Sequence, residues 1–131
     1  MRYLNMRKQA ASSASWVKDK HKVDSILTAN ADKNFVKRIK TPDQYPKMDL
    51  GNGDSATHKM AWGEDDKGAA YVYPTIVHDT VTNSLKQLNN QEAWQHAIKN
   101  KEYIKFNDTK EADWFSRKYK AVWGKQYWDE Q

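Results

Sequence analysis

The sequence has no cysteine, which cross-links chains, and few of the aliphatic residues that usually form a core. Cysteine is absent from the 131 residues, which excludes disulfides, thiolate metal sites and cysteine nucleophiles within this sequence. Leu, Ile, Val and Phe together number only 20, a fraction low enough to raise the question of disorder. No apolar run approaches the roughly 20 residues that cross a bilayer. We therefore expect no membrane span and no secretory leader.

Aromatic residues are abundant where aliphatic ones are scarce. The chain holds 6 Trp and 7 Tyr, and each ring buries enough area to replace aliphatic side chains in a core. This composition predicts a small domain with an aromatic core and some non-globular chain attached to it.

Positive charge is concentrated in the first part of the chain. The net charge is +5, yet residues 1–50 hold 11 Lys and Arg against 5 Asp and Glu, while residues 51–131 hold 11 against 12. Such asymmetry is typical of an arm attached to a body. We predict a basic arm over residues 1–44 and a compact body over residues 45–131.

Within the arm, the spacing of apolar residues predicts two short helices after an extended tail that reaches Ser15. Trp16, Val23 and Leu27 form one helical stripe, with Ser15 as N-cap and Asn30 as the stop. A second helix is expected over residues 33–40, begun by an Asp32 cap and with three residues facing inward: Phe35, Val36 and Ile39.

The body is predicted to begin with an irregular connection that closes in a turn at Asn52–Gly53, followed by a hairpin over residues 57–77. The polar loop between its strands has glycine at both ends, which pairs Trp62 with Ala69. That register places Met60 opposite Tyr71, and His58 opposite Tyr73. Residues 79–90 fit either a helix or a turn with a short strand at 84–88.

Two helix starts are marked near the C-terminus. Asn89 with Glu92, and Asp108 with Glu111, are capping-box patterns, and each precedes an amphipathic stripe. The second stripe, which includes Phe115, ends at Gly124, and residues 103–106 between the helices are expected to be extended. The predicted fold class is α+β: a small antiparallel sheet packed by two C-terminal helices, with a helical or extended arm.

The patterns that usually indicate catalysis or metal binding are missing from the sequence. Glu64, Asp65 and Asp66 lack the spacing of a calcium loop, so a solvated turn is the favoured interpretation over a cation site. His58 and His78 fall on opposite faces of the expected hairpin, and no zinc, phosphate-loop or nucleophile-elbow motif occurs. We expect a non-enzymatic protein without catalytic residues, metal or cofactor.

Candidate partner-binding residues lie at both ends of the chain. A basic helix face over residues 33–40 is suited to phosphates and superficially resembles a helix-turn-helix, although a solvated surface is the simpler interpretation. Tyr127 and Trp128 follow the Gly124 stop, so we expect them to dock on a neighbouring protein. The complete candidate set is Trp16, Lys33, Lys37, Arg38, Lys40, Tyr127 and Trp128.

Four segments together resemble a small domain encoded by tailed bacteriophages, which occurs alone or inside longer phage proteins. The match runs roughly over residues 34–123, and its most specific elements are Thr-His-x-Met from Thr57 and Tyr-Pro-Thr-Ile-Val from Tyr73. The segments that carry it are residues 45–64, 70–77, 93–106 and 111–120. The resemblance implies a phage origin and assigns no catalytic residue.

The expected function is that of a virion structural or accessory protein, made in the host cytoplasm and docked on other virion proteins through its arm and aromatic surface. One alternative is a phage protein that contacts nucleic acid with its basic first half. A second alternative is a small hydrolase or a host-directed inhibitor.

Overall fold

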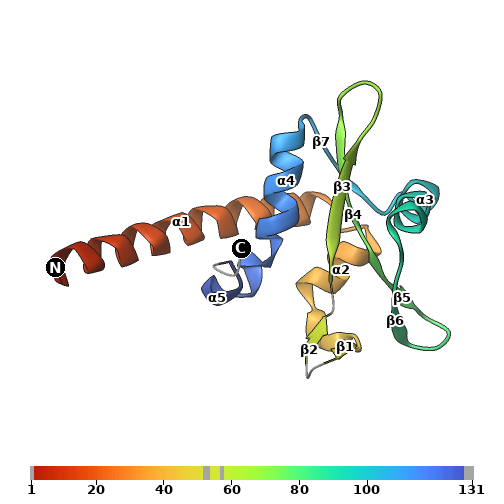
Figure 1. Ribbon diagram of the computed structural model, residues 1–131, viewed down its shortest axis with the longest axis horizontal. Coiled ribbons are helices and arrows are strands. Elements are labelled where there is room, and N and C mark those ends of the chain that lie inside the picture. Colours follow the sequence, from red (N-terminus) through yellow and green to blue (C-terminus); the bar gives the residue numbers. More distant parts are fainter. Residues whose placement is uncertain (1, 52–53, 57, 129–131) are drawn as a thin grey trace.

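The computed structural model describes residues 2–51, 54–56 and 58–128. Its fold is α+β, as the sequence predicts (Figure 1). The helices are α1 (Arg2–Ala29), α2 (Asn34–Lys40), α3 (Asn90–Asn100), α4 (Thr109–Lys118) and α5 (Lys125–Trp128), with 3-10 turns η1 (Pro42–Gln44) and η2 (Tyr119–Trp123). The strands are β1 (Met48–Gly51), β2 (Asp54–Ala56), β3 (Met60–Glu64), β4 (Ala70–Pro74), β5 (Ile76–Asp79), β6 (Ser84–Gln87) and β7 (Ile104–Phe106).

Helix α1 is longer than expected. It runs without a break through Ser15, so the predicted extended tail and the predicted N-cap at Ser15 are both wrong. The residue types explain the difference, because the Arg, Met, Lys, Gln and Ala residues that precede Ser15 are good helix formers. The end near Asn30 is confirmed, since α1 stops at Ala29 and the Asn30 side chain donates to the carbonyl of Ile26 at 2.8 Å.

The strands form three small antiparallel sheets. The largest has the order β3-β4-β7, while β5 pairs with β6, and β1 pairs with β2. The β1–β2 pair replaces the irregular connection expected after Tyr45, whereas the predicted turn at Asn52–Gly53 and the hairpin start at Thr57 lie outside the described residues. The alternative of a turn and a short strand within 79–90 is confirmed by β6.

The β3–β4 hairpin exists, but its predicted register is wrong. Trp62 pairs with Val72 instead of Ala69, so Met60 lies opposite Pro74 instead of Tyr71. The reason is a tighter turn, in which the Asp65 amide donates to the Ala69 carbonyl at 2.9 Å. The Asp65 carboxylate also accepts from the Lys67 and Ala69 amides and from the Tyr71 hydroxyl, so it orders the turn from within. This agrees with the interpretation of the acidic triplet as a turn.

Strand β4 separates two layers of packed side chains, because successive residues of a strand point to opposite faces. Tyr73 belongs to a cluster with Ala93 and Ala97 of α3. Val72 belongs to the larger core cluster with Phe115 of α4. The two C-terminal helices therefore cover opposite faces of the sheet, and both helix starts are confirmed by side-chain caps from Asn89 and Asp108.

The core cluster crosses the boundary that the sequence suggested between residues 44 and 45. Val23 and Leu27 of α1 lie in the same cluster as Ile104 and Phe115. The predicted inward face of α2 is confirmed, and its residues belong to that cluster too: Phe35, Val36 and Ile39. The C-terminal half of α1 and all of α2 are thus part of the body.

Candidate functional site

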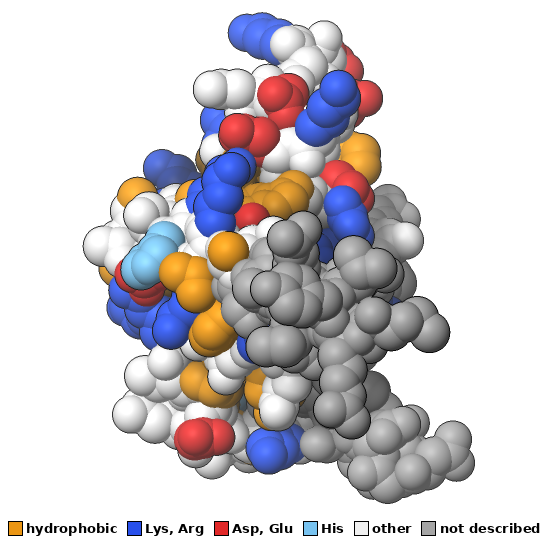
Figure 2. Space-filling model, turned by 90° about the vertical axis from the view of Figure 1, so that its left-hand side faces the viewer, with side chains coloured by type: hydrophobic (Ala, Val, Ile, Leu, Met, Phe, Trp, Pro, Cys, Tyr) orange, Lys and Arg blue, Asp and Glu red, His pale blue; other side chains and the backbone are white. Residues whose placement is uncertain are grey.

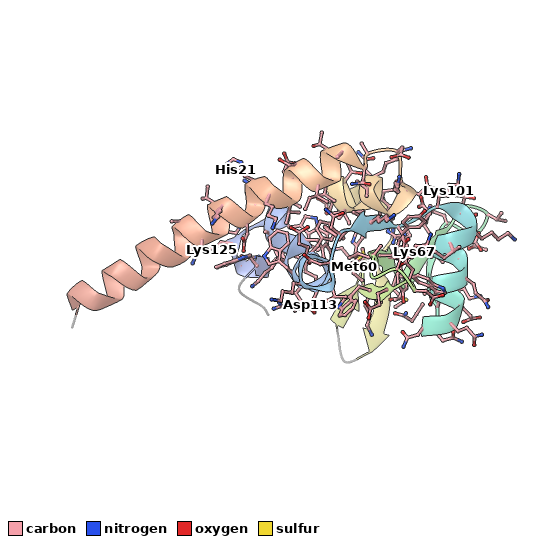
Figure 3. The ribbon with its side chains drawn as sticks, turned by 90° about the horizontal axis from the view of Figure 1, so that it is seen from above. His21, Met60, Lys67, Lys101, Asp113 and Lys125 are labelled. Atoms are coloured by element: carbon pink, nitrogen blue, oxygen red, sulfur yellow. The ribbon has the colours of Figure 1, made fainter. Side chains whose placement is uncertain are left out.

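Helix α1 combines an anchored half with a projecting half. Its C-terminal half packs against η2, α4 and α5, whereas its N-terminal half extends away from the rest of the chain (Figure 1). The view from above shows the same arrangement, with α1 running past the body on one side (Figure 3). The part of the predicted arm that projects is therefore the N-terminal half of one continuous helix.

The anchored half is fixed by indole hydrogen bonds to distant segments. Trp16 Nε1 donates to the Ala121 carbonyl at 3.0 Å, and Trp128 Nε1 donates to Asp19 Oδ2 at 2.8 Å. Tyr127 packs its ring edge-on against Trp123, with ring centroids 5.9 Å apart. These three predicted partner-binding aromatics lie near one another, but they bind their own chain. Their contacts here join α1 to the C-terminal segment.

Lysine side chains lie over aromatic rings around this anchor. Lys22 Nζ lies 4.3 Å from the ring centroid of Trp114, and Lys118 Nζ lies 4.7 Å from that of Trp128. Such cation–π contacts stabilise exposed sites by about 0.5–1 kcal/mol each.

On the described part of the face in Figure 2, Lys and Arg side chains are interspersed with Asp and Glu. This face therefore has mixed charge.

The predicted basic face of α2 is not one continuous cationic surface. Lys37 is exposed, and Lys40 is exposed with its Nζ 3.5 Å from the Thr28 hydroxyl. Lys33 pairs with Asp32 at 3.2 Å, so Asp32 binds a lysine side chain instead of capping the helix. Arg38 is the clear correction, because it is only 3% exposed and points into the protein. Its burial removes one of four cations from the expected phosphate-binding set.

Arg38 forms hydrogen bonds inside the protein, and no described residue forms an ion pair with it. Its Nε donates to His58 Nε2 at 3.4 Å, and its terminal Nη2 donates to the Ile76 carbonyl. Within the described part of the chain, all three ion pairs involve other residues. Burial lowers the pKa of Arg38, although the nearby Tyr45 and Glu102 act in the opposite direction. A guanidinium is not deprotonated in proteins, so Arg38 stays charged.

The position of Arg38 in the sequence predicts that it is buried, although the polarity of arginine suggests the opposite. Arg38 follows the buried Phe35 by three residues and precedes the buried Ile39 directly, so it lies on the inward helix face. A pattern that counts arginine as polar places it outside. The position in the helix, taken without regard to residue type, predicts the inside.

A pocket of about 300 Å³ opens beside this arginine. Its apolar wall includes Phe35 of α2 and Ile76 of β5. Seven polar side chains also line it: Asn34, Arg38, Tyr45, His78, Thr80, His96 and Glu102. The sequence does not predict this pocket, because its lining comes from α2, β4, β5, α3 and connecting segments that lie far apart along the chain.

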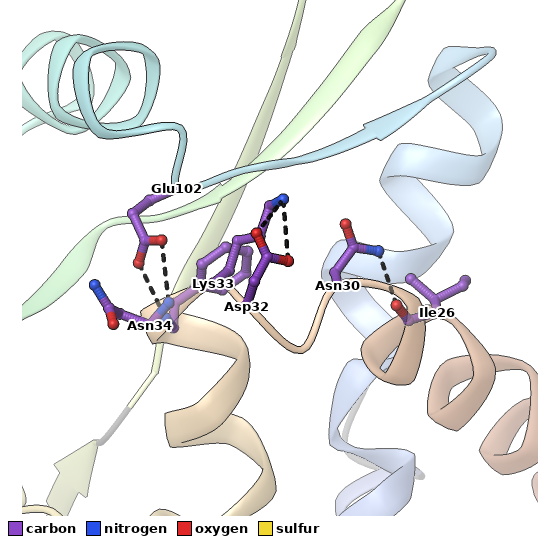
Figure 4. Close-up of polar contacts among 7 residues, drawn as sticks. Ile26, Asn30, Asp32, Lys33, Asn34 and Glu102 are labelled. Carbon is purple, nitrogen blue, oxygen red and sulfur yellow. Dashed lines mark hydrogen bonds and ion pairs between the residues drawn. The ribbon is translucent and has the colours of Figure 1, made fainter.

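Glu102 fixes one side of this pocket. It is 8% exposed, and its two carboxylate oxygens accept from the backbone amides of Asn34 at 3.0 Å and Phe35 at 3.2 Å (Figure 4). These are first-turn amides of α2, which have no acceptor within their own helix. Glu102 therefore caps α2 from a segment far away in sequence, a role that Asp32 was expected to fill.

The histidines lie in separate environments. His58 is 5% exposed and packs against the rings of Tyr119 and Trp123. Its pKa is lowered to about 3, first by burial and then by the charges of Arg38 and Lys120. His78 instead packs against Tyr45 and lies 2.9 Å from Asn83 Oδ1. The structure therefore does not join the two into a dyad.

His96 contributes the one unpaired atom in this region. Its Nδ1 is the only buried side-chain nitrogen or oxygen of the described residues that has no hydrogen-bond partner. Among those residues, no three His, Cys, Asp or Glu side chains are grouped closely enough to hold a metal ion. The chemistry gathered here is therefore a buried guanidinium, a carboxylate that accepts from helix amides, and further hydrogen-bonding side chains beside an apolar wall.

None of the helices in the described ranges is long and apolar enough to cross a membrane.

Comparison with known proteins finds no relative. No family model, curated protein or solved structure matches this chain.

Proposed function

We propose that this protein is a non-enzymatic structural or accessory component of a bacteriophage virion, and that it docks on a neighbouring virion protein through the N-terminal half of α1. The observation that carries the proposal is the geometry of α1, a 28-residue helix of which only the C-terminal half packs on the body (Figure 1). The protein would be made in the host cytoplasm and reside in the particle.

The physics of isolated helices supports a partner for the projecting half. Helix formation is cooperative with a costly nucleus, so helices shorter than about 12–15 residues are marginal in water without packing. The anchored half supplies the nucleus, and a partner surface would stabilise the rest. Docking of a helix into a groove is a common way in which such segments are recognised.

The charge of the projecting half indicates the kind of surface it would meet. Its sequence holds Arg2, Arg7 and Lys8, and it has no acidic residue before Asp19. Complementary potentials favour encounter and suppress wrong partners. The proposed partner is therefore an acidic surface on another virion protein.

The setting in a phage particle comes from the resemblance of residues 45–64, 70–77, 93–106 and 111–120 to a small domain of tailed phages.

Charge reversal in the projecting half tests the proposal. The triple variant Arg2→Glu, Arg7→Glu, Lys8→Glu should lower incorporation into purified virions more than about tenfold, because like charges across an interface cost several kcal/mol. The matched control reverses three exposed lysines of the body, namely Lys59, Lys86 and Lys110. Quantitative mass spectrometry of the particles measures both. Equal incorporation of wild type and the arm variant would contradict the proposal.

Nucleic-acid binding is separated from protein docking by salt. Phosphate contacts release counterions, so binding of α1 to duplex DNA would weaken steeply with salt. Submicromolar DNA binding at physiological salt that is lost in the arm variant, and kept in the lysine control, would replace docking by the nucleic-acid alternative.

A further inference from the structure

We propose that the pocket beside Arg38 binds a small organic carboxylate, with the carboxylate on the Arg38 guanidinium and an apolar body against Phe35 and Ile76. This inference is independent of how α1 docks. It rests on a buried charge, on the donors that this charge leaves free and on the wall beside it.

The charge requirement comes from Arg38. Its guanidinium carries five N–H donors, and two hydrogen bonds join it to His58 and to the Ile76 carbonyl. No described residue accepts from the other three donors, so these are left for a ligand. Within the part of the chain that the structure describes, no carboxylate lies within ion-pair distance of this cation. Burying the guanidinium carries a desolvation cost, and no described carboxylate compensates it at ion-pair distance. A bound anion would offset that cost.

Glu102 does not fill this role, although it lines the same pocket. Both of its oxygens accept from the first-turn amides of α2, where the helix dipole favours negative charge (Figure 4). Its charge is therefore held by the helix. The Glu102 carboxylate still contributes to the electrostatic potential at Arg38. It would repel a bound anion, and the repulsion would grow with the negative charge of that anion.

This repulsion and the apolar wall decide between two classes of anion. A phosphate carries more negative charge and no apolar body, so it would meet more repulsion from Glu102 and gain nothing from Phe35 or Ile76. A monocarboxylate matches the planar fork of a guanidinium with two parallel hydrogen bonds. The volume of about 300 Å³ falls at the lower end of the range for small-molecule sites, in which convergent polar groups fix the orientation of the ligand.

Amide chemical shifts of the full-length 15N-labelled chain provide the test, with sodium benzoate as the probe. We expect saturable shifts at Asn34, Arg38 and Val77, around the pocket. Benzyl alcohol has the same ring without the charge, and it should bind at least about tenfold more weakly because it loses a charge-assisted pair of bonds. Equal binding of the alcohol, or no saturable shift at these amides with benzoate, would overturn the proposal.

A matched pair of variants locates the binding. Thr80 is exposed and lines the pocket, whereas its neighbour Val81 is exposed and does not. Thr80→Trp should weaken benzoate binding at least about tenfold by occupying the mouth, and Val81→Trp should leave it unchanged. Both positions are on the surface, so the test does not depend on a core residue. Benzoate binding that is equally strong in both variants would place the ligand elsewhere and refute the assignment.

A parallel titration with inorganic phosphate tests which class of anion the pocket binds. Phosphate should produce no saturable shift at these amides over the concentrations at which benzoate saturates. Shifts by phosphate that equal those by benzoate would overturn the assignment to a carboxylate with an apolar body.

Discussion

Arg38 Nε lies 3.4 Å from His58 Nε2, so a permanently charged guanidinium donates to an imidazole that must be neutral to accept. Both side chains are nearly inaccessible to solvent. The pair joins α2 to the segment that leads into β3, and it ties the protonation of one histidine to the stability of the fold.

The first prediction concerns pH. The pKa of His58 is lowered from 6.5 to about 3, so between these values the unfolded chain binds a proton that the folded chain does not. The free energy of unfolding should therefore fall by up to about 1.4 kcal/mol per pH unit as the pH drops below 6.5. His58→Gln keeps an acceptor and removes this proton uptake. Chemical unfolding from pH 7 to 5 should show a smaller slope for the variant, and identical slopes would contradict the assignment.

A second prediction concerns the core. Phe115 has no exposed surface and packs against the rings of Phe106 and Tyr119. Phe115→Ala should lower the free energy of unfolding by about 3–5 kcal/mol, because it removes a large buried ring and leaves a cavity. Val81 is 92% exposed, and Val81→Ala should change the free energy of unfolding by less than about 0.5 kcal/mol. Denaturant unfolding measures both, and similar values would show that Phe115 is not central to the core.

The third prediction concerns Glu102 as a cap of α2. Glu102→Gln keeps the shape but removes the negative charge and leaves one acceptor oxygen for two amides. We expect a loss of about 1–3 kcal/mol in the free energy of unfolding. The exposed Glu64 provides the matched control, since Glu64→Gln should have little effect. A loss no larger than that of the control would show that the amides of Asn34 and Phe35 do not depend on this carboxylate.

The fourth prediction concerns the bond between Trp128 and Asp19. A double-mutant cycle with Trp128→Phe and Asp19→Asn should give a coupling energy of about 0.5–1.5 kcal/mol, typical of a hydrogen bond. The sequence alone suggested that Trp128 is free to bind a neighbour, in which case the isolated fold would tolerate its loss. Strictly additive effects of the two substitutions on unfolding would support that earlier interpretation.

Local features of the fold were predictable from the sequence. The caps by Asn89 and Asp108 involve residues three positions apart, so their geometry is set within one turn of helix. The inward face of α2 and the short strand β6 also follow from local spacing. The hairpin register was missed because it depends on how the Asp65 side chain closes the turn.

Features that depend on distant contacts were not predictable. The cap of α2 comes from Glu102 and the pocket joins α2 to β5 and α3, and no periodicity within α2 signals either one. The residue type of Arg38 predicts a solvated face, whereas its position in the helix predicts the buried side chain that the structure has. The place of Trp128 after Gly124 likewise predicts a side chain free of the body, but its partner Asp19 lies far away in the sequence.

The cap that Glu102 provides also sets an order of assembly. The two bonds span 68 and 67 residues along the chain, so the first-turn amides of α2 gain these acceptors only after the α3–β7 connection has arrived. Contacts of such sequence separation close late and slow the folding of a small domain. Hydrogen exchange at the amides of Asn34 and Phe35 would then report the opening of that distant connection, and not the fraying of the helix end on which they lie.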